Sequence, residues 1–149
     1  MIKRIKHLLL AAVLAASSVL SIAPAYATSM TDYLENKIVD WLFRGQAYTP
    51  PATIYVGLLT AACSDSSAGT EVTGGSYARV GVTSALANWA GTQSAGSTVA
   101  SSGTGGTTSN NGAVTFAAPT ANWGSVTHFA LYDASTAGNQ LFCAALTVS

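Results

Sequence analysis

The sequence predicts a mainly β protein, an antiparallel β-sandwich preceded by one N-terminal α-helix. Three observations predict this class. Apolar residues recur at helical spacing clearly in only one place, residues 31–44, whereas later segments alternate with the period of a strand, and turns rich in Gly, Ser and Asn separate them. The chain has 149 residues, which is the length of a single domain.

The predicted helix covers residues 31–44, TDYLENKIVDWLFR. Thr31 is a fair N-cap, acidic residues occupy the first turn where the helix dipole favours them, and Gly45 follows as a C-terminal cap. The polar side is mixed in sign, so we expect the apolar face to pack against a sheet or a neighbouring subunit rather than a membrane. That face consists of Leu34, Ile38, Trp41 and Leu42.

After a proline pair the apolar period changes to two. Residues 52–61 (ATIYVGLLTA) predict a buried strand, and residues 77–84 (YARVGVTS) predict another. After a low-complexity segment, residues 113–120 (AVTFAAPT) predict the next ordered part of the chain. Residues 124–133 and 139–148, joined by a turn with Gly and Asn, predict a β-hairpin.

Residues 90–112, AGTQSAGSTVASSGTGGTTSNNG, are small, uncharged and of low complexity. Such a segment buries too little apolar area to offset the entropy cost of ordering it. We therefore expect a long flexible loop, which could order against a partner. Long loops of this kind inside a domain are often functional.

Residues 1–27 are organised like a secretory signal peptide. Residues 3–6 (KRIK) are basic, residues 8–22 are apolar and uncharged, and residues 25–27 (AYA) form a small-x-small cleavage site. The apolar run is shorter than the roughly 20 residues of a membrane span. We expect cleavage, a single mature domain over residues 28–149 with no stable membrane span, and a secreted, periplasmic or extracellular location. An uncleaved N-terminal anchor is the alternative.

The mature charge excludes two classes of partner. Residues 28–149 carry three basic residues against six acidic ones, a net charge of −3. Binding to nucleic acid depends on Lys and Arg against phosphate, so we expect no nucleic-acid partner. The same shortage of cations leaves no basic patch for anionic lipid.

Cys63 and Cys143 are the only cysteines. In an exported chain, two cysteines suggest one disulfide. The alternative is a pair of free thiols, since sequence alone does not fix their separation in space. A bond between two subunits also stays open.

The mature chain offers no constellation for catalysis, for a metal ion or for a cofactor. His128 is its one histidine, and Asp133 would point to the opposite face of a flat strand, which disfavours Ser/His/Asp catalysis. Asp65 and Glu71 lie in a predicted loop, where acids are usually solvated, so paired-carboxylate chemistry with Asp133 is disfavoured too. The cysteines lack zinc-site spacing. We predict a protein that is not an enzyme.

Two tryptophans are the better candidates for a binding role. Trp89 and Trp123 both follow Ala-Asn and precede a small residue. Either could be a stacking platform for a sugar, and either could instead plug the end of a sandwich, because cores also use Trp as a large apolar residue.

Four segments carry a family resemblance: MTDYLENKIVDWLFRG, PATIYVGLLTAA, GTEVTGGSYARVGVT and NNGAVTFAAPTANWGSVTHFALYDASTAGNQLFCAALT. In this order they cover most of residues 30–148. On them the chain resembles small phage virion proteins, the phage tail fibre or Gp80-like family. The resemblance implies a structural β-domain used in virion assembly, with other fibre subunits as partners and no catalytic residues to carry over.

The chain departs from that family at both ends. Members are not normally exported, so Met30 resembles an original start to which a signal was fused, naturally or by construction. Members usually continue past this point with a further polar turn and β-rich segment. A sheet edge lacking its last strand would accept a strand from another chain. A truncated reading frame is the alternative.

The sequence therefore predicts a non-enzymatic assembly subunit of the tail-fibre or virion type, exported and forming extracellular oligomers or filaments with copies of itself by strand addition. Its location would be extracellular, or the virion if used as in the resembled family. A secreted module that binds carbohydrate or a cell-surface glycan is the alternative.

Overall fold

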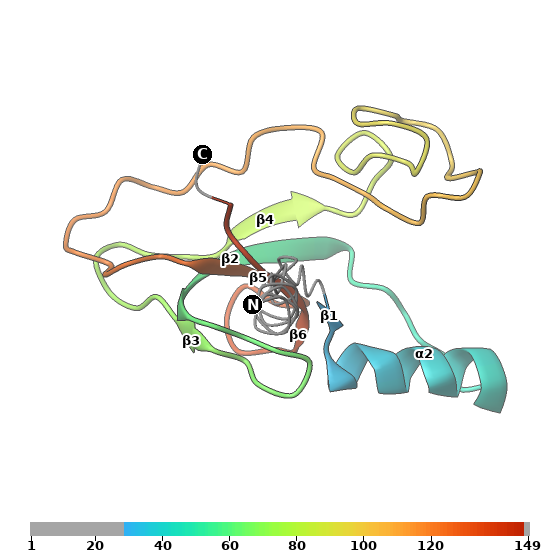
Figure 1. Cartoon of the computed structure of the whole chain (residues 1–149), viewed down its shortest axis with the longest axis horizontal. Helices are drawn as coiled ribbons and strands as arrows, with labels where there is room; N and C mark the ends of the chain where they lie inside the picture. Colours follow the sequence, from blue (N-terminus) through green and yellow to red (C-terminus); the bar gives the residue numbers. More distant parts are fainter. Residues whose placement is uncertain (1–28, 148–149) are drawn as a thin grey trace, which may run out of the picture.

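The structure of the protein, a computed structural model, describes residues 29–147, so the predicted signal peptide lies outside the described residues. One helix and six strands make up this part of the chain (Figure 1). They are β1 (Ser29–Met30), α2 (Asp32–Arg44), β2 (Thr53–Ala61), β3 (Thr70–Glu71), β4 (Val80–Thr83), β5 (His128–Tyr132) and β6 (Gln140–Ala145).

All six strands belong to one antiparallel sheet, ordered β1-β6-β5-β2-β3, with β4 also paired to β2. β2 is the central strand. One of its edges pairs with β5; the other pairs with β4 along residues 53–56 and with β3 along residues 59–61. β5 and β6 form the predicted hairpin.

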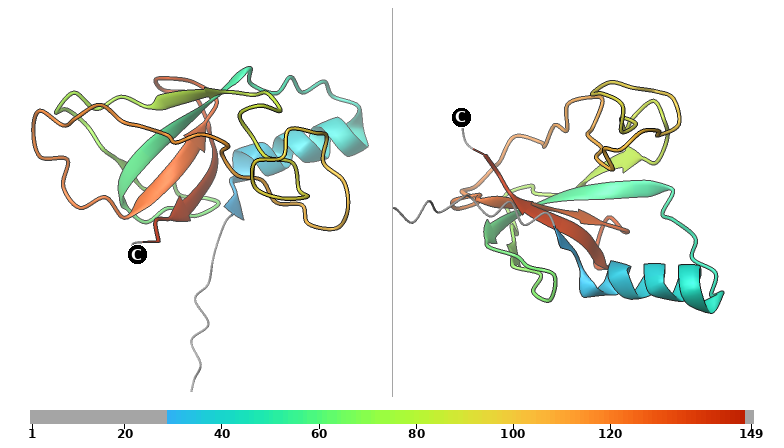
Figure 2. Two further views of the ribbon diagram at one scale, coloured as in Figure 1. Left: turned by 90° about the horizontal axis from the view of Figure 1, so that it is seen from above. Right: turned by 45° about the vertical axis from the view of Figure 1, so that its right-hand side comes forward.

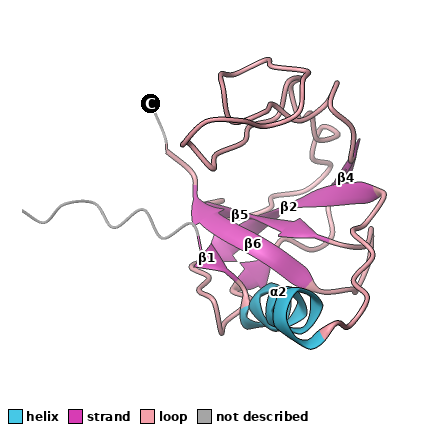
Figure 3. Cartoon of the chain, turned by 90° about the vertical axis from the view of Figure 1, so that its right-hand side faces the viewer, coloured by secondary structure: helices cyan, strands magenta, loops and turns pink. Residues whose placement is uncertain are grey.

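The mainly β class, the antiparallel pairing and the single N-terminal helix are confirmed. The architecture differs from the expected sandwich in one respect, because the strands of residues 29–147 form one sheet and not two. The second layer comes instead from α2 on one side of the sheet and the loop of residues 84–127 on the other (Figures 1 and 3). Residues 113–120 lie in that loop without pairing as a strand.

Pairing register sorts the sheet into two faces. Leu59 of β2 lies opposite His128, and Gly57 lies opposite Ala130, which in turn pairs with Cys143 of β6. This face holds the buried core: Leu59, Ala130, Tyr132 and Cys143, with Tyr55 and Cys63 packed against it.

The other face contacts the long loop. Ile54, Leu131 and Phe142 lie under Trp89 and Thr108, and together they line a cavity of about 250 Å³. A layer of loop therefore covers this apolar face less densely than a second sheet would.

α2 confirms the predicted helix within one residue. Thr31 precedes it with extended backbone but makes no side-chain cap bond, because its hydroxyl donates to the Gln140 and Leu141 carbonyls of β6. Gly45 ends the helix in the left-handed conformation, at φ 66°. No helix within residues 29–147 has the length and apolar content needed to cross a bilayer.

Cys63 and Cys143 form the predicted disulfide within one chain. Their Cα atoms are 6.3 Å apart, within the usual range for such a bridge, and they are separated by 80 residues in sequence. The bond attaches the loop after β2 to β6.

Candidate functional site

The C-terminal half of α2 extends beyond the sheet and exposes apolar side chains (Figure 2). Leu34 is buried and Ile38 is half-buried, but Trp41 is 57% exposed and Leu42 is 60% exposed. The four residues predicted to form one packing face are thus divided between the sheet and solvent. The exposed set, which we name the α2 tip, is Val39, Trp41, Leu42 and Phe43.

The α2 tip receives little support from its own chain. α2 contacts only β1 and β6 among the described elements, and its buried residue, Leu34, lies near the N-terminal end. An ion pair joins Arg44 to Asp40 at 2.8 Å, but the two side chains are 69% and 35% exposed, so water screens the pair and it contributes little. Short helices are marginal in water without packing. The tip therefore has the character of a surface that gains stability when covered.

A second cluster lies on the core face of the sheet, around Arg79. Its guanidinium binds both carboxylate oxygens of Glu71, at 2.8 and 2.7 Å, and donates to the Ala134 and Ala137 carbonyls. Only 8% of the Arg79 side chain is exposed. Because Glu71 is in β3 and the two carbonyls belong to the β5–β6 turn, this one side chain ties three parts of the fold together.

Tyr77 completes the cluster at a gap in the sheet. Its hydroxyl donates to Glu71 at 2.8 Å and accepts the N–H of Leu58 at 2.9 Å. β4 pairs with β2 before this point and β3 pairs with it afterwards, so the hydroxyl takes the place of a ladder partner. The backbone N–H of a central strand is thereby satisfied.

The ionisation of this cluster follows from its contacts. Burial raises the pKa of Glu71, but hydrogen bonds from Arg79 and Tyr77 and the Arg79 charge outweigh burial, and the net result is a pKa below the ordinary value. Burial raises the pKa of Tyr77, and the neighbouring Glu71 carboxylate raises it further. The ion pair with a neutral Tyr77 is thus the favoured state. The cluster serves packing and pairing.

Gly57 of β2 provides the space for this cluster. A Cβ there would lie 2.8 Å from a ring carbon of Tyr132, 3.0 Å from Glu71 Oε1 and 3.1 Å from the Tyr77 hydroxyl. No ordinary side chain fits at those distances. The absence of a side chain lets the ion pair approach the backbone of the central strand.

Trp123 has a structural role in the described fold. It is half-buried, its indole N–H donates to the Gly75 carbonyl at 2.9 Å, and its ring meets Tyr77 edge-on with centroids 5.5 Å apart. The stacking role predicted for Trp123 thus stays a prediction, with its ring already engaged by Tyr77.

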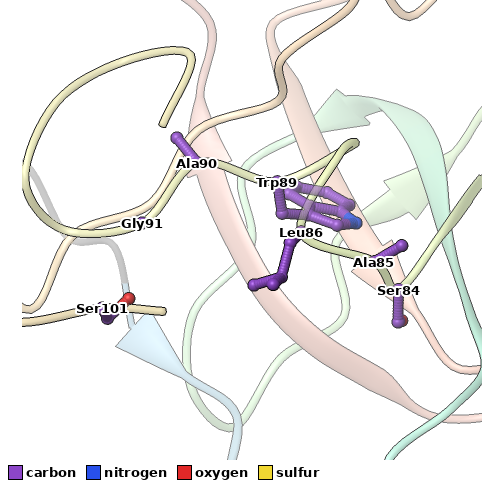
Figure 4. A pocket seen from close by; sticks show the side chains of 7 residues that line it. All are labelled: Ser84, Ala85, Leu86, Trp89, Ala90, Gly91 and Ser101. Atoms are coloured by element: carbon purple, nitrogen blue, oxygen red, sulfur yellow. The ribbon is translucent and has the colours of Figure 1, made fainter. Parts of the chain in front are cut away.

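Trp89 lines a cavity of about 440 Å³ together with Ser84, Ala85, Leu86, Ala90, Gly91 and Ser101 (Figure 4). It is half-buried, and its backbone bridges to Asn110 across the base of the long loop. On its other side it covers the apolar face of the sheet. Trp89 therefore holds the base of the long loop against the sheet and also lines the cavity of about 440 Å³.

The remaining chemical candidates are held in separate contacts. His128 interacts with the neighbouring Thr127 hydroxyl at 2.8 Å, while Asp133 accepts two hydrogen bonds from Asn139. Asp65 accepts the N–H of Ser66 at 2.8 Å. Within residues 29–147, no three His, Cys, Asp or Glu side chains gather as a metal site would require.

The two sides of the sheet differ in how far their outer strands are paired. On one side, β6 is covered only in part, because the short strand β1 pairs with it only at Phe142 and Cys143. On the far side, β4 pairs with β2, and no other strand among the described residues pairs with it. Its outer edge is four residues long, from Val80 to Thr83.

Comparison with known proteins adds a family. A family profile described as "Podophage GP4 fiber I protein gp80" matches residues 29–149, a span that includes every described residue. No curated protein matches the chain.

Proposed function

We propose a function for this chain, which belongs to the podophage GP4 fiber I protein gp80 family. It is a non-enzymatic structural subunit that is exported and that assembles with copies of itself through the α2 tip. The observation that carries this proposal is the exposure of large apolar side chains on a helix that leaves the sheet, with Phe43 77% exposed. Large contiguous apolar patches exposed on a monomer mark interaction sites with proteins, membranes or ligands.

A second copy of the same chain is the occupant that fits best. The tip contains two aromatic residues, Trp41 and Phe43, and aromatic residues are enriched at the centre of subunit interfaces. Homo-oligomers commonly use one self-complementary patch on both subunits. Asp40 and Arg44 flank the tip with opposite charges, so two tips can meet without net repulsion.

The oligomeric state tests this proposal. We would express the full chain, purify the product and measure its mass by light scattering after size exclusion, for the wild type and for Leu42→Ser and Leu86→Ser. Leu86 is the matched control, since it is 57% exposed but lies in the long loop. We expect an oligomer for the wild type and for Leu86→Ser, and a monomer for Leu42→Ser. A monomeric wild type would overturn the proposal.

Export is the second part of the proposal, and it rests on the basic, apolar and small-residue pattern of residues 1–27. Mass spectrometry of the product from a bacterial host should show a chain that begins at Thr28. A full-length product that stays in the cytoplasm would contradict export while leaving the assembly proposal untouched.

Strand addition would extend such oligomers into filaments. The outer edge of β4 supports this, because an unpaired edge can accept a strand from another subunit. Negative-stain microscopy of the purified protein should then show filaments. Only dispersed particles of uniform size would argue against strand addition.

Carbohydrate or cell-surface binding is the second candidate function, and the cavity beside Trp89 is the observation that favours it. A glycan array should show specific binding that Trp89→Ala removes without loss of the folded state. Trp123→Ala serves as the comparison, because that ring is engaged by Tyr77.

A further inference from the structure

Two short segments of the long loop pair with each other at its base, and we name these segments, residues 88–90 and 109–111, the stem. The Ala90 N–H donates to the Ser109 carbonyl, and the Asn111 N–H donates to the Asn88 carbonyl, both at 2.8 Å. Between these two bonds lies the only β bridge that the described long loop makes. The residues between the two segments are therefore held to the fold at a narrow base.

The side chain of Asn111 adds a second attachment to the stem. Its N–H₂ donates to the Leu86 carbonyl at 3.4 Å and to the Ala87 carbonyl at 3.2 Å. Both distances are at or beyond the long end of the usual range for such bonds. The side-chain oxygen is buried and has no hydrogen-bond partner among the described residues. Asn111 thus holds the stem only as a donor, in surroundings that contain acceptors.

The residue after Asn111 makes this side chain chemically vulnerable. Asparagine is among the labile residues of proteins, because the backbone nitrogen of the next residue can attack its side-chain carbonyl carbon. A side chain on that next residue hinders the attack, and glycine has none. Gly112 is exposed, no atom lies within 4 Å of a Cβ built on it, and its N–H makes no hydrogen bond within residues 29–147. The attacking nitrogen is therefore unhindered.

The other asparagines lack this arrangement. Each is followed by a residue with a large side chain, as the sequence shows for Asn36, Asn88, Asn110, Asn122 and Asn139. Only Asn111 precedes a glycine. The chain therefore has one position where attack by the backbone is favoured, and that position lies in the stem.

We propose that Asn111 is a site of spontaneous deamidation, and that its conversion opens the stem of the long loop. The Gly112 nitrogen bonds to the Asn111 side-chain carbonyl carbon, and the side-chain nitrogen leaves as ammonia. Water then opens the resulting five-membered ring at either carbonyl, which gives aspartate or isoaspartate. One amide and one water thus become one carboxyl group and one ammonia, with no change of oxidation state. Water reaches the ring from the exposed Gly112 side.

The product does not fit the place that the amide occupied. A carboxylate is ionised at neutral pH and has no N–H to donate, so it would meet the Leu86 and Ala87 carbonyls as a third acceptor. A charge that is partly buried without a partner is costly. Isoaspartate also lengthens the main chain between Asn111 and Gly112. Both products therefore favour a stem that has separated.

Separation of the stem changes what the loop covers. Trp89 belongs to the stem, and its side chain lies over the apolar face of the sheet beside Leu131 and Phe142. We expect the modified chain to expose this face, which the unmodified loop covers. The α2 tip takes no part in these steps, so this inference does not depend on the assembly proposed above.

Peptide mass spectrometry tests the modification. Protein purified after expression of the full chain is incubated at neutral and at mildly alkaline pH, and its peptides are compared over time. We expect conversion at Asn111 to be several-fold faster than at any other asparagine, and faster at alkaline pH, where more of the backbone nitrogen is deprotonated. Gly112→Ala should slow it several-fold, although the open space there leaves the fold intact. Conversion no faster than at Asn110, or an equal rate in Gly112→Ala, would overturn the proposal.

Hydrogen exchange then tests the opening of the stem. Asn111→Asp supplies one product in uniform form, and Asn110→Asp is the matched control, since it makes the same charge change at an exposed neighbour. We expect Asn111→Asp and the aged wild type to lose protection at the Ala90 amide, while β2 and β5 stay protected. Asn110→Asp should resemble fresh wild type. Unchanged protection at Ala90 in both modified samples, or its loss throughout the sheet, would overturn the proposal. Leu42→Ser should deamidate like the wild type, which keeps this outcome apart from that of assembly.

Discussion

Arg79 and Glu71 form a two-pronged ion pair across the gap between β3 and β4, with Nε to Oε1 at 2.8 Å and Nη2 to Oε2 at 2.7 Å. The Arg79 guanidinium carbon also lies 3.3 Å from the centroid of the Tyr132 ring, in the buried core. One arginine thus combines an ion pair, two carbonyl contacts and an aromatic contact. Lysine could not reproduce this arrangement, since it lacks the planar fork.

Arg79→Met should lower the free energy of unfolding by about 3 kcal/mol, because it leaves the Glu71 carboxylate partly buried without its cation. Urea denaturation followed by circular dichroism measures this loss. Arg44→Met, which removes the exposed ion pair with Asp40, is the control and should change stability by less than about 1 kcal/mol. Equal losses in the two variants would show that burial does not distinguish the two pairs.

Acid should weaken the fold through Glu71. Its pKa is lowered in the folded protein, so its contribution is complete above the ordinary value of 4.5 and is lost as the pH falls through the lower folded pKa. Urea midpoints measured from pH 7 down to pH 3 should fall more steeply for the wild type than for Glu71→Gln. Parallel curves would mean that Glu71 does not govern the acid response.

Gly57→Ala should destabilise the protein by about 1–3 kcal/mol, because the new Cβ would lie 2.8 Å from the Tyr132 ring and the surrounding residues would have to shift. Gly112→Ala is the matched control. No atom lies within 4 Å of a Cβ built there, so its stability should stay near that of the wild type. Thermal denaturation of both variants gives the comparison, and an unaffected Gly57→Ala would refute the crowding argument.

Loss of the disulfide should cost about 4 kcal/mol in the chain-entropy description, since the bond closes a loop of 80 residues. Denaturation of the wild type with and without a reducing agent measures the change. Cys63→Ala/Cys143→Ala should resemble the reduced wild type and should not respond to the reductant. A reductant effect on the double variant would point to a cause other than this bond.

The local elements were predictable from the sequence because each depends on nearby residues. The 3.6-residue spacing of Leu34 and Ile38 indicates α2, and the period-two runs indicate β2 and the β5–β6 hairpin. The single sheet was not predictable. Phe116 packs on Tyr77 at 6.2 Å between ring centroids, but its segment, residues 113–120, pairs with no strand of the described sheet. The alternation of apolar residues in a sequence does not tell whether a segment will find a neighbouring strand to pair with.

The site residues divide in the same way. The α2 face and the Cys63–Cys143 bond were visible in the sequence, although the exposure of Trp41 and Leu42 depends on where the sheet ends. Arg79 carried no local signal. Glu71 is only eight residues away, but the Ala134 and Ala137 carbonyls are 55 and 58 residues away, and only the folded chain brings them to the same guanidinium.

The position of β2 at the centre of the sheet has a consequence for synthesis on the ribosome. Leu59 pairs with His128, so about 70 residues must be added before one edge of β2 finds its partner. At roughly 5–20 residues per second, the nascent strand waits several seconds with that edge unpaired. The late arrival of β5 makes completion of the sheet one of the last events of folding, and keeps the emerging polypeptide open while it is being made.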